Sequence, residues 1–310
     1  AGGMTHVYLA ERSDGDFRQK VAVKVLKQSI SNELPGKYFQ REKQILADLQ
    51  HPNIANIYDG GLTEGGRPYL VMEYINGLPV TAYCDQRRLT IDQRVRLFIK
   101  VCEAVNHAHQ NLIIHKDLKP DNIYVDDQGM VKLMDFGLAH IADESMDNGD
   151  FNMRAFTPAY ASPEQIKNQK ITTASDIYQL GLLFYKMITG VHRNEVEAEC
   201  LSGRSQLGRQ GAVKKRRSEI LRARKIDHIR TYETMIRGDL QAVVNQAAAQ
   251  EPAARYASVQ DMRHDLEHYL NHQPLSVRKA SFGYIVSKYY KRNLIKIKIG
   301  TAFLAILLVL

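Results

Sequence analysis

Three short segments carry side chains that could hold a phosphate group and a hard metal ion. Lys24 ends a Val-Ala-Val-Lys run, and residues 115–122 read His-Lys-Asp-Leu-Lys-Pro-Asp-Asn. Asp117 in that segment can accept a proton. Asn122, with the Asp135 that opens an Asp-Phe-Gly sequence, offers the amide and carboxylate oxygens that Mg²⁺ prefers. These residue types suit phosphoryl transfer, which needs positioning and charge neutralisation more than covalent chemistry.

In order and spacing, these segments resemble the protein kinase catalytic domain. The residues of these motifs are most similar to those of the bacterial Hanks-type (eukaryotic-like) serine/threonine kinases that carry a membrane anchor. The resemblance implies an α+β fold of two lobes: an antiparallel sheet with one helix in the N-terminal lobe, and mostly helix in the C-terminal lobe. We expect the N-lobe at 1–74 with its first strand missing, the C-lobe at 75–272, a basic juxtamembrane linker at 273–298 and the start of a transmembrane helix at 299–310. A chain that begins with Ala1 inside a Gly-rich motif is expected to be a fragment cut at both ends.

The resemblance implies a site for ATP and Mg²⁺. Asp117 would accept the proton of the substrate hydroxyl, Lys119 marks the serine/threonine class, and these two with Asn122 are the expected catalytic residues. Asn122 and Asp135 are the expected ligands of Mg²⁺. The residues expected to bind the nucleotide are Gly2, Gly3, Val7, Ala22, Lys24, Glu42, Met72 and Glu73.

Each nucleotide-binding residue has an expected role. The two glycines would let backbone amides approach the phosphates, although Thr5 stands where a third glycine usually falls. Val7 and Ala22 would contact the adenine, and backbone groups of Met72 and Glu73 would meet its edge. Lys24 would bind the α and β phosphates. Glu42 lies within an apolar stripe of a helix expected at 38–49, where a buried carboxylate needs a partner, and Lys24 is the candidate.

Other residues are expected to brace the site. The resemblance pairs Glu164 of Ser-Pro-Glu with Arg255, lets Asp176 cap a helix and support the loop around Asp117, and places Thr157 against Asp117 and Lys119. Where the family usually has His-Arg-Asp, this chain has Lys116. A lysine lacks the planar fork of arginine, so we expect weak dependence on phosphorylation of the activation segment, with Ser145 as a candidate phosphorylation site.

The periodicity of apolar residues predicts the elements that must position these groups. Strands are expected at 7–10, 21–26 and 69–72. Helices are expected at 38–49, 95–108, 175–189, 240–249 and 258–270.

Charge and composition indicate which partners and which cellular location to expect. The 310 residues are 44% hydrophobic and carry a net charge of +8, but residues 271–310 hold seven Lys or Arg and no acid, which leaves 8 − 7 = +1 for the rest. A nucleic-acid partner is therefore not expected. Three widely spaced cysteines suit a reducing compartment. A basic cluster directly before the apolar run 299–310 indicates a single-pass protein of the cell membrane. Together with the cysteines, it favours a cytoplasmic kinase domain. A short helix packed on the core remains the alternative for 299–310, and a solvated linker for 273–298.

A second basic stretch lies at 200–237, with eleven Lys or Arg against three acids. It is either a solvated surface or a docking surface for an acidic protein substrate. Two functions stay open for the whole chain: an active kinase in membrane-linked signalling, or a catalytically inactive kinase-fold scaffold. A small-molecule kinase is disfavoured by the peptide-cradle segment 157–164, and the resemblance leaves a homodimer open.

Overall fold

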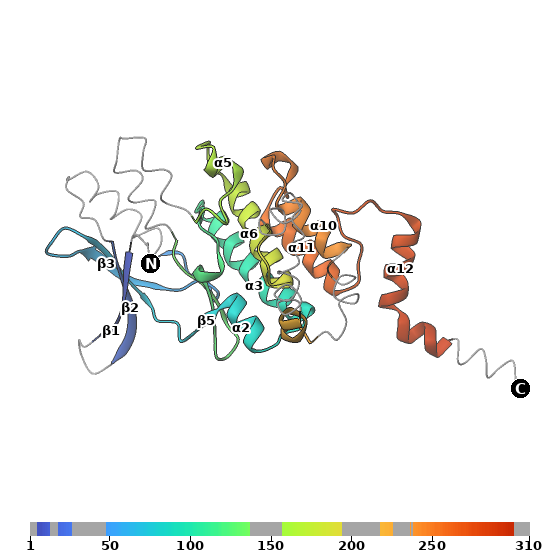
Figure 1. Ribbon diagram of the computed structural model, residues 1–310, viewed down its shortest axis with the longest axis horizontal. Coiled ribbons are helices and arrows are strands. Elements are labelled where there is room, and N and C mark those ends of the chain that lie inside the picture. The colour runs from blue at the N-terminus through green and yellow to red at the C-terminus, as the bar shows by residue number, and fades with distance from the viewer. Residues whose placement is uncertain are drawn as a thin grey trace, which may run out of the picture.

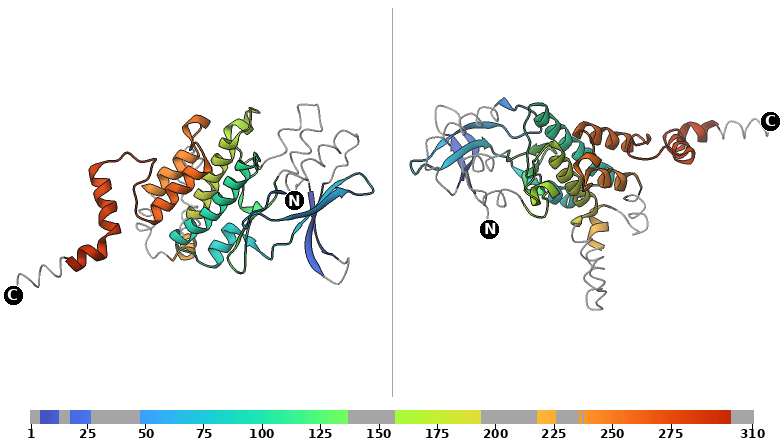
Figure 2. Two further views of the ribbon diagram at one scale, coloured as in Figure 1. Left: turned by 180° about the vertical axis from the view of Figure 1, so that it is seen from behind. Right: turned by 90° about the horizontal axis from the view of Figure 1, so that it is seen from above.

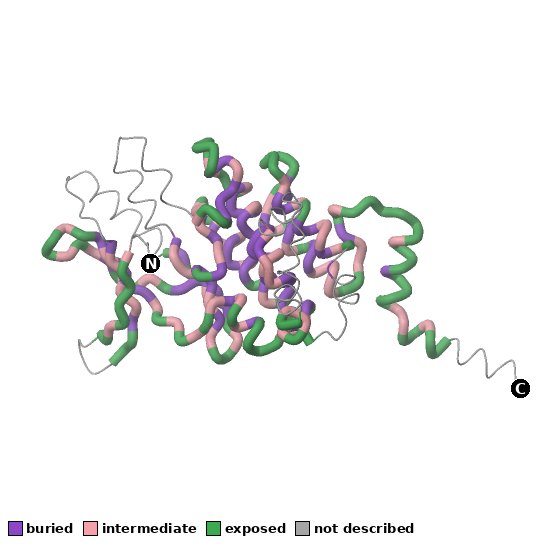
Figure 3. Tube along the Cα trace, in the orientation of Figure 1, coloured by how far each residue is buried: buried purple, intermediate pink, exposed green. Residues whose placement is uncertain are grey.

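The computed structural model describes residues 5–12, 18–26, 48–136, 157–193, 218–225, 236 and 238–300. A β-sheet lobe lies at one end of the molecule and a helical lobe follows it along the long axis (Figure 1). The expected two-lobed α+β architecture is confirmed. Buried residues concentrate along the central helices (Figure 3).

The N-terminal lobe is built on one antiparallel sheet. Its strands are β1 (Thr5–Arg12), β2 (Gln19–Leu26), β3 (Ile57–Leu62) and β4 (Pro68–Glu73), in the order β1-β2-β4-β3. Directly paired residues of an antiparallel sheet share a face, and so do residues two apart on one strand. The pairs Val7–Lys24, Ala22–Met72 and Lys24–Leu70 therefore place these side chains on one face of the sheet.

The C-terminal lobe is organised around two long helices. These are α3 (Ile91–Gln110) and α6 (Thr173–Thr189), with α2 (Val80–Gln86), α5 (Pro163–Ile166), α10 (Asp239–Ala247) and α11 (Val259–Leu270) around them. Thr90 and Thr172 cap the N-termini of α3 and α6 with capping boxes, and Gly190 ends α6 in the left-handed conformation. A Cβ at Gly181 would lie 2.9 Å from the Cβ of Ala247, so this glycine allows α6 and α10 to approach closely.

A small second sheet brings the two metal-ligand candidates together. It contains β5 (Gly77–Pro79), β6 (Ile123–Asp126) and β7 (Val131–Leu133), and a 3₁₀ turn, η1 (Pro120–Asn122), leads into β6. Ile123 at the start of β6 pairs with Leu133 at the end of β7. The residues just outside this pair, Asn122 and Met134, must therefore be neighbours, and the amide of Met134 donates to the carbonyl of Asn122 at 2.8 Å.

The predicted strands at 7–10, 21–26 and 69–72 are confirmed within β1, β2 and β4, and the helices predicted at 95–108 and 175–189 within α3 and α6. The helices predicted at 240–249 and 258–270 correspond to α10, which ends two residues earlier, and to α11, which begins one residue later. The helix predicted at 38–49 lies almost entirely outside the described residues. The short β5–β7 sheet was not predicted, because three- and four-residue strands show no readable period. Strand β3 was not predicted either, because Asp59, Gly60 and Gly61 interrupt its apolar pattern. The N-cap of α6 is Thr172 rather than Asp176, which lies in the first turn of that helix.

The segment after residue 272 contains a helix that was not predicted. Helix α12 (Phe282–Arg292) begins at the N-cap Ser281 and lies at the end of the helical lobe that is remote from the sheet (Figures 1 and 2). Among the described residues, no helix has both the length and the apolar character needed to cross a bilayer. Residues 301–310 of the expected transmembrane segment lie outside the described part of the chain.

Candidate active site

Asp117 is held in place by donors on both of its carboxylate oxygens. Oδ2 accepts a hydrogen bond from Lys119 Nζ at 2.6 Å and one from Asn122 Nδ2 at 3.3 Å, and Oδ1 accepts one from the amide of Thr157 at 3.0 Å. Lys119 Nζ also donates to Thr157 Oγ1 at 2.7 Å. The predicted contacts of Thr157 with Asp117 and Lys119 are confirmed. The carboxylate is therefore fixed in orientation but still partly exposed, with its side chain 21% accessible.

Lys24 and Asp135 face each other across the junction of the lobes. The Nζ of Lys24 lies 2.8 Å from Oδ1 of Asp135, and Lys24 is 9% exposed. Glu42, the partner predicted for this lysine, lies outside the described residues, as do Gly2 and Gly3. A buried ammonium needs a counter-charge, and Asp135 supplies one. The family resemblance placed Lys24 and Asp135 on opposite walls of one nucleotide cleft, but it gave Glu42 as the partner of Lys24 and did not predict this direct ion pair.

A cleft opens beside the Lys24–Asp135 pair. The residues that line it are Lys24, Ala55, Ile57, Leu70, Met72, Met134, Asp135 and Phe136. Its walls are mostly apolar with one cation and one carboxylate, which is the general composition of a small-molecule site. Ala22 packs against Met72 on the same face of the sheet, and Val7 lies on that face but is 63% exposed.

Glu73 lies at the end of β4, but its side chain does not line the cleft. Its carboxylate binds Lys132 Nζ of the helical lobe at 2.9 Å and accepts hydrogen bonds from the amide and side chain of Asn56. The amide of Glu73 donates to the carbonyl of Asn56 at 2.8 Å. Glu73 therefore ties β4 to β7, at the junction of the two lobes.

The backbone around Asp117 is fixed by side chains of α6. Asp176 is fully buried and accepts hydrogen bonds from the amides of His115 and Lys116 and from Nε2 of His109, each at 2.8 Å. Gln179, one turn further along α6, accepts from the amide of Leu118 at 2.8 Å. The predicted bracing role of Asp176 is confirmed.

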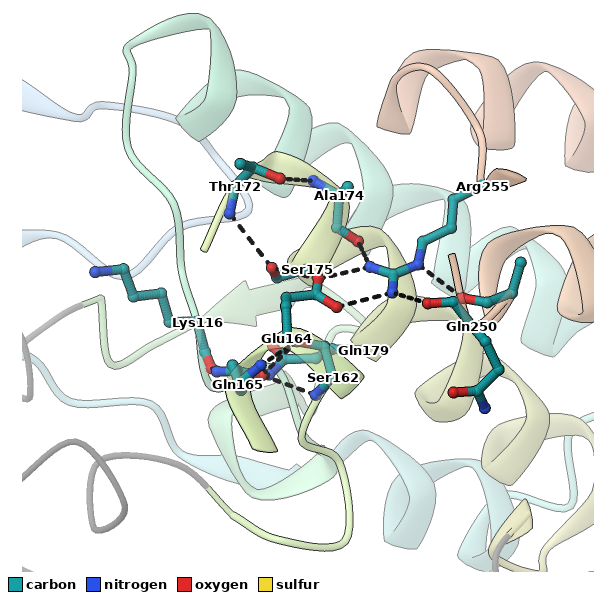
Figure 4. Close-up of polar contacts among 11 residues, drawn as sticks. Lys116, Ser162, Glu164, Gln165, Thr172, Ala174, Ser175, Gln179, Gln250 and Arg255 are labelled. Carbon is teal, nitrogen blue, oxygen red and sulfur yellow. Dashed lines mark hydrogen bonds and ion pairs between the residues drawn. The ribbon is translucent and has the colours of Figure 1, made fainter. Parts of the chain in front are cut away.

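Lys116 has an unusual backbone conformation, with φ at 68° in the left-handed region. A lysine pays about 1–3 kcal/mol for such a conformation unless its surroundings enforce it. Here they do, because Asp176 accepts from its amide while Gln165 and Gln179 both donate to its carbonyl, at 2.7 and 2.8 Å. Figure 4 shows that carbonyl between the two amide side chains while the lysine side chain points away from them. Asp135 is also left-handed, with φ at 65°.

His115 links the two loops of the site. Its Nδ1 accepts from the amide of Asp117 at 3.3 Å, so the ring proton sits on Nε2, which lies 2.9 Å from the carbonyl of Met134. Its ring also packs against Phe136, with centroids 4.8 Å apart. The imidazole therefore connects the segment that carries Asp117 to the segment that carries Asp135.

A buried ion pair joins α5 to the segment before α11. Both Nη atoms of Arg255 bind the carboxylate of Glu164, at 2.7 and 2.9 Å, which confirms the predicted pair (Figure 4). Ser175 Oγ donates to the same carboxylate at 2.6 Å. Burial alone would raise the pKa of Glu164, but the hydrogen bonds from Arg255 and Ser175 outweigh it and lower the pKa to about 2. Glu164 is therefore ionised at any physiological pH.

The residues around Asn122 and Asp135 fit a Mg²⁺ ion that also binds phosphate. The Nδ2 of Asn122 donates to Asp117, and among the described residues nothing donates to its Oδ1, so this oxygen is free to act as a ligand. Among those residues there is no cluster of three His, Cys, Asp or Glu that could enclose a metal by itself. Mg²⁺ commonly binds one or two protein oxygens and completes its shell with phosphate and water.

One arginine of the basic stretch 200–237 is buried, and two glutamines near Asp117 were not identified from the sequence. Arg224, counted in the basic stretch 200–237, is 1% exposed and donates to the carbonyls of Ile188, Met187 and Ile220, so it is not part of a docking surface. Most of that stretch lies outside the described residues. Gln165 and Gln179 were not identified from the sequence, because their contacts with the loop span dozens of residues and follow no local pattern.

Comparison with known proteins agrees with this geometry. A family model described as "Protein kinase domain" matches residues 1–266. The serine/threonine-protein kinase PknB of Mycobacterium tuberculosis is 34% identical over 286 residues, which cover 90% of this chain and 43% of that protein. The serine/threonine-protein kinase PrkC of Bacillus subtilis is 32% identical over 268 residues, covering 86% and 38%. The chain thus spans less than half the length of these relatives.

A crystal structure of Rad53 residues 1–466 in complex with AMP-PNP shares the fold, with a TM-score of 0.58 and 21% identity over 87% of this chain and 62% of that one. The family match and the shared fold cover both lobes, including every described residue that surrounds Asp117 and Asp135. The chain belongs to the protein kinase domain family.

Proposed function

We propose that the protein is an ATP-dependent serine/threonine kinase that transfers the γ-phosphoryl group to hydroxyls of protein substrates. The observation that carries the proposal is the fixed carboxylate of Asp117 between Lys119, Asn122 and Thr157. Its site is continuous with the cleft that holds the Lys24–Asp135 pair, because Met134 and Asn122 are joined by a hydrogen bond. A base, a cation and two oxygen ligands are thus available around one cleft.

Each residue has a defined task in this reaction. Asp117 orients the substrate hydroxyl and accepts its proton, a role worth about 10²–10⁴ in rate. Lys119 donates to Asp117 and to Thr157, so its charge lies next to the position of the transferred group. Lys24 would bind the phosphates, while Asn122 and Asp135 would hold Mg²⁺. The ion, when bound, neutralises charge on the phosphate oxygens.

The alternative function is that of an inactive scaffold. A scaffold has no need of a carboxylate that three donors fix in orientation, or of left-handed conformations at Lys116, next to Asp117, and at Asp135 in the cleft. Lys24, Asp117, Asn122 and Asp135 are all present, and the Lys24–Asp135 pair, the Asn122–Asp117 hydrogen bond and the Met134–Asn122 hydrogen bond keep them close to one another. These facts support the active enzyme.

Transfer of label from ATP tests the proposal directly. The 310-residue chain is incubated with γ-labelled ATP, Mg²⁺ and peptides that contain Ser, Thr or Tyr, beside an Asp117→Asn control. We expect label on Ser or Thr with the wild type and a loss of at least a hundredfold with the control. Label in both proteins, or in neither, would count against an active kinase, and label on Tyr alone would overturn the serine/threonine assignment.

We also propose a membrane-linked role for this kinase domain. Its support is the sequence from residue 271 onward, where seven basic residues and no acid precede an uncharged, mostly apolar run. Sedimentation of the chain with lipid vesicles tests this role separately from phosphotransfer. A chain that stays in the supernatant with every vesicle composition would remove the membrane link and leave the kinase assignment intact.

Regulation by phosphorylation is expected to be weak. The backbone of Lys116 is already held by Asp176, Gln165 and Gln179 without help from a phosphate. Its ammonium also cannot bind a phosphate through a planar fork. Ser145, the candidate site, lies outside the described residues. A Ser145→Ala variant with no activity would disprove weak dependence.

A further inference from the structure

Helix α12 docks on the helical lobe through its polar side. Asp239 at the start of α10 accepts from Lys288 Nζ at 2.5 Å, from Arg278 Nη1 at 2.9 Å and from the hydroxyl of Tyr284 at 3.1 Å. That hydroxyl also accepts from the amide of Leu275 at 3.2 Å. We call Asp239, Arg278, Tyr284 and Lys288 the Asp239 clasp. Lys288 is only 7% exposed, so the clasp is a packed contact and not a loose surface ion pair.

The cations of the clasp stabilise the charged form of Asp239. Burial alone would raise the pKa of Asp239, but hydrogen bonds from Lys288 and Arg278 lower it, so the carboxylate stays charged. The guanidinium of Arg278 stacks on the ring of Tyr284 with its carbon 4.5 Å from the centroid. The helix is therefore held in one rotational setting about its axis.

The opposite side of α12 is apolar and exposed. Its apolar stripe consists of Phe282, Ile285, Val286, Tyr289 and Tyr290. At 100° per residue these five positions fall within one face, whose centre lies roughly 150° from the clasp residues of the helix. Phe282 is 85% exposed. A helix of a soluble domain normally buries its apolar face against the core, and α12 does the reverse.

Charge around the stripe identifies what could cover it. Residues 271–310 contain no acid, and Lys279, Lys291, Arg292, Lys296 and Lys298 add positive charge at the two ends of α12. A second copy of this helix would bring these like charges together. An anionic lipid surface would instead attract these Lys and Arg residues. An apolar face of Phe, Ile and Tyr flanked by Lys and Arg is typical of helices that lie in a membrane interface.

The position of the helix is compatible with such a surface. In Figures 1 and 2, α12 lies beyond the helical lobe and the sheet lobe lies at the other end. A membrane that contacts α12 would therefore lie at the end of the molecule that is remote from the sheet lobe.

We propose that α12 is an interfacial helix: its apolar stripe lies in the surface of an anionic membrane, and the Asp239 clasp on its other side fixes the kinase domain to it. The inference rests on the proposed membrane-linked function and adds to it. A transmembrane segment alone would only tether the domain, whereas the clasped helix sets which side of the domain faces the membrane.

Single tryptophans can test the proposal, because the chain contains no tryptophan of its own. Tyr289→Trp places the probe on the stripe, and Ser287→Trp places it at another exposed position of α12, outside the stripe. Both are made in the full 310-residue chain. Fluorescence is measured with vesicles of phosphatidylcholine plus phosphatidylglycerol, with phosphatidylcholine alone, and with brominated lipid as a quencher.

We expect Tyr289→Trp to show a blue shift and strong quenching by brominated lipid in anionic vesicles, and Ser287→Trp to show neither. If the chain sediments with vesicles but both probes stay exposed, the membrane link survives and the interfacial helix is excluded. Equal shifts at both positions would also overturn it. A blue shift at position 289 that needs no lipid and grows with protein concentration would show that a second copy covers the stripe.

A second pair of variants tests the contribution of the stripe. Phe282→Ser is expected to weaken binding to anionic vesicles about tenfold or more, because burying a Phe side chain contributes about 1.5–3 kcal/mol. Gly283→Ser introduces the same side chain one position along, where an added Cβ would meet nothing within 4 Å, and is expected to bind as the wild type does. Equal binding by the two variants would overturn the proposal. Phosphotransfer is measured on the same samples, so failure of the kinase assignment is seen independently.

Discussion

Replacing Arg255 with alanine should destabilise the helical lobe severely. The side chain is fully buried, and its five N–H groups all have acceptors: two go to Glu164 and one each to the carbonyls of Ala174, Ala249 and Gln250. Truncation would leave a buried carboxylate and three carbonyls without these donors. Breaking one partner of a buried pair costs about 3–5 kcal/mol. The domain as a whole is expected to have only about 5–15 kcal/mol of stability.

Denaturant and thermal unfolding at neutral pH would measure the loss. At about 2–4 °C per kcal/mol for a domain of this size, Arg255→Ala should lower Tm by about 6–20 °C. Arg255→Lys keeps the charge but loses the planar fork, so it should recover only part of the stability. Arg222→Ala is the matched control, because this arginine is exposed, and a surface change of this kind usually stays within about 0.5 kcal/mol.

A double-mutant cycle with Glu164→Ala would separate the pair from its surroundings. If the pair is the source of the effect, the double variant should be less destabilised than the sum of the two single variants. A loss below about 1 kcal/mol for Arg255→Ala, or strict additivity in the cycle, would refute this account of the bidentate pair.

Three further predictions concern pH and positioning. The pKa of Glu164 is about 2 in the fold and ordinarily 4.5, so its contribution to the free energy of unfolding is present above pH 4.5 and is lost as the pH falls toward 2. Urea unfolding of the wild type should show a loss of about 3 kcal/mol across this pH range, and Glu164→Gln should not show it. The same dependence of the unfolding free energy on pH in both proteins would disprove this assignment. Asp176→Asn should lower kcat about 10- to 100-fold with little change in the KM for ATP, because the amides of His115 and Lys116 lose a charged acceptor; a change in KM alone would contradict this. Thr157→Val should lower kcat while Thr157→Ser preserves it, since only the hydroxyl accepts from Lys119, and equal rates for both variants would show that this contact has no role.

The sequence predicted the parts of this molecule that depend on local pattern. Lys24, Asp117, Asn122 and Asp135 were found from short motifs, and the long helices from their apolar period. Tertiary contacts were found only where the family resemblance supplied them, as for Glu164 with Arg255. The structure brings together the motif residues that it describes, whereas Gly2, Gly3 and Glu42 remain predictions.

Contacts without a local signature could not be predicted. Gln179 accepts a hydrogen bond from the amide of Leu118, the residue after Asp117, across 61 residues, and nothing near Gln179 in the sequence distinguishes it from a surface glutamine. Three tyrosines follow one another closely in α12, but the hydroxyl of Tyr284 is bound to Asp239 and faces the protein. Only the docked position of α12 separates the tyrosine that clasps the domain from Tyr289 and Tyr290, which face outward.

The most direct test of the central claim is the affinity for ATP with and without Mg²⁺, measured by calorimetry on the wild type, Lys24→Met and Asp135→Asn. If one magnesium nucleotide binds between these two side chains, Mg²⁺ should strengthen binding to the wild type, and Asp135→Asn should lose this gain. Lys24→Met should bind about 10- to 100-fold more weakly, since a charged hydrogen bond contributes about 1.5–3 kcal/mol. An Asp135→Asn variant with the full gain from Mg²⁺, or a Lys24→Met variant with wild-type affinity, would contradict the account.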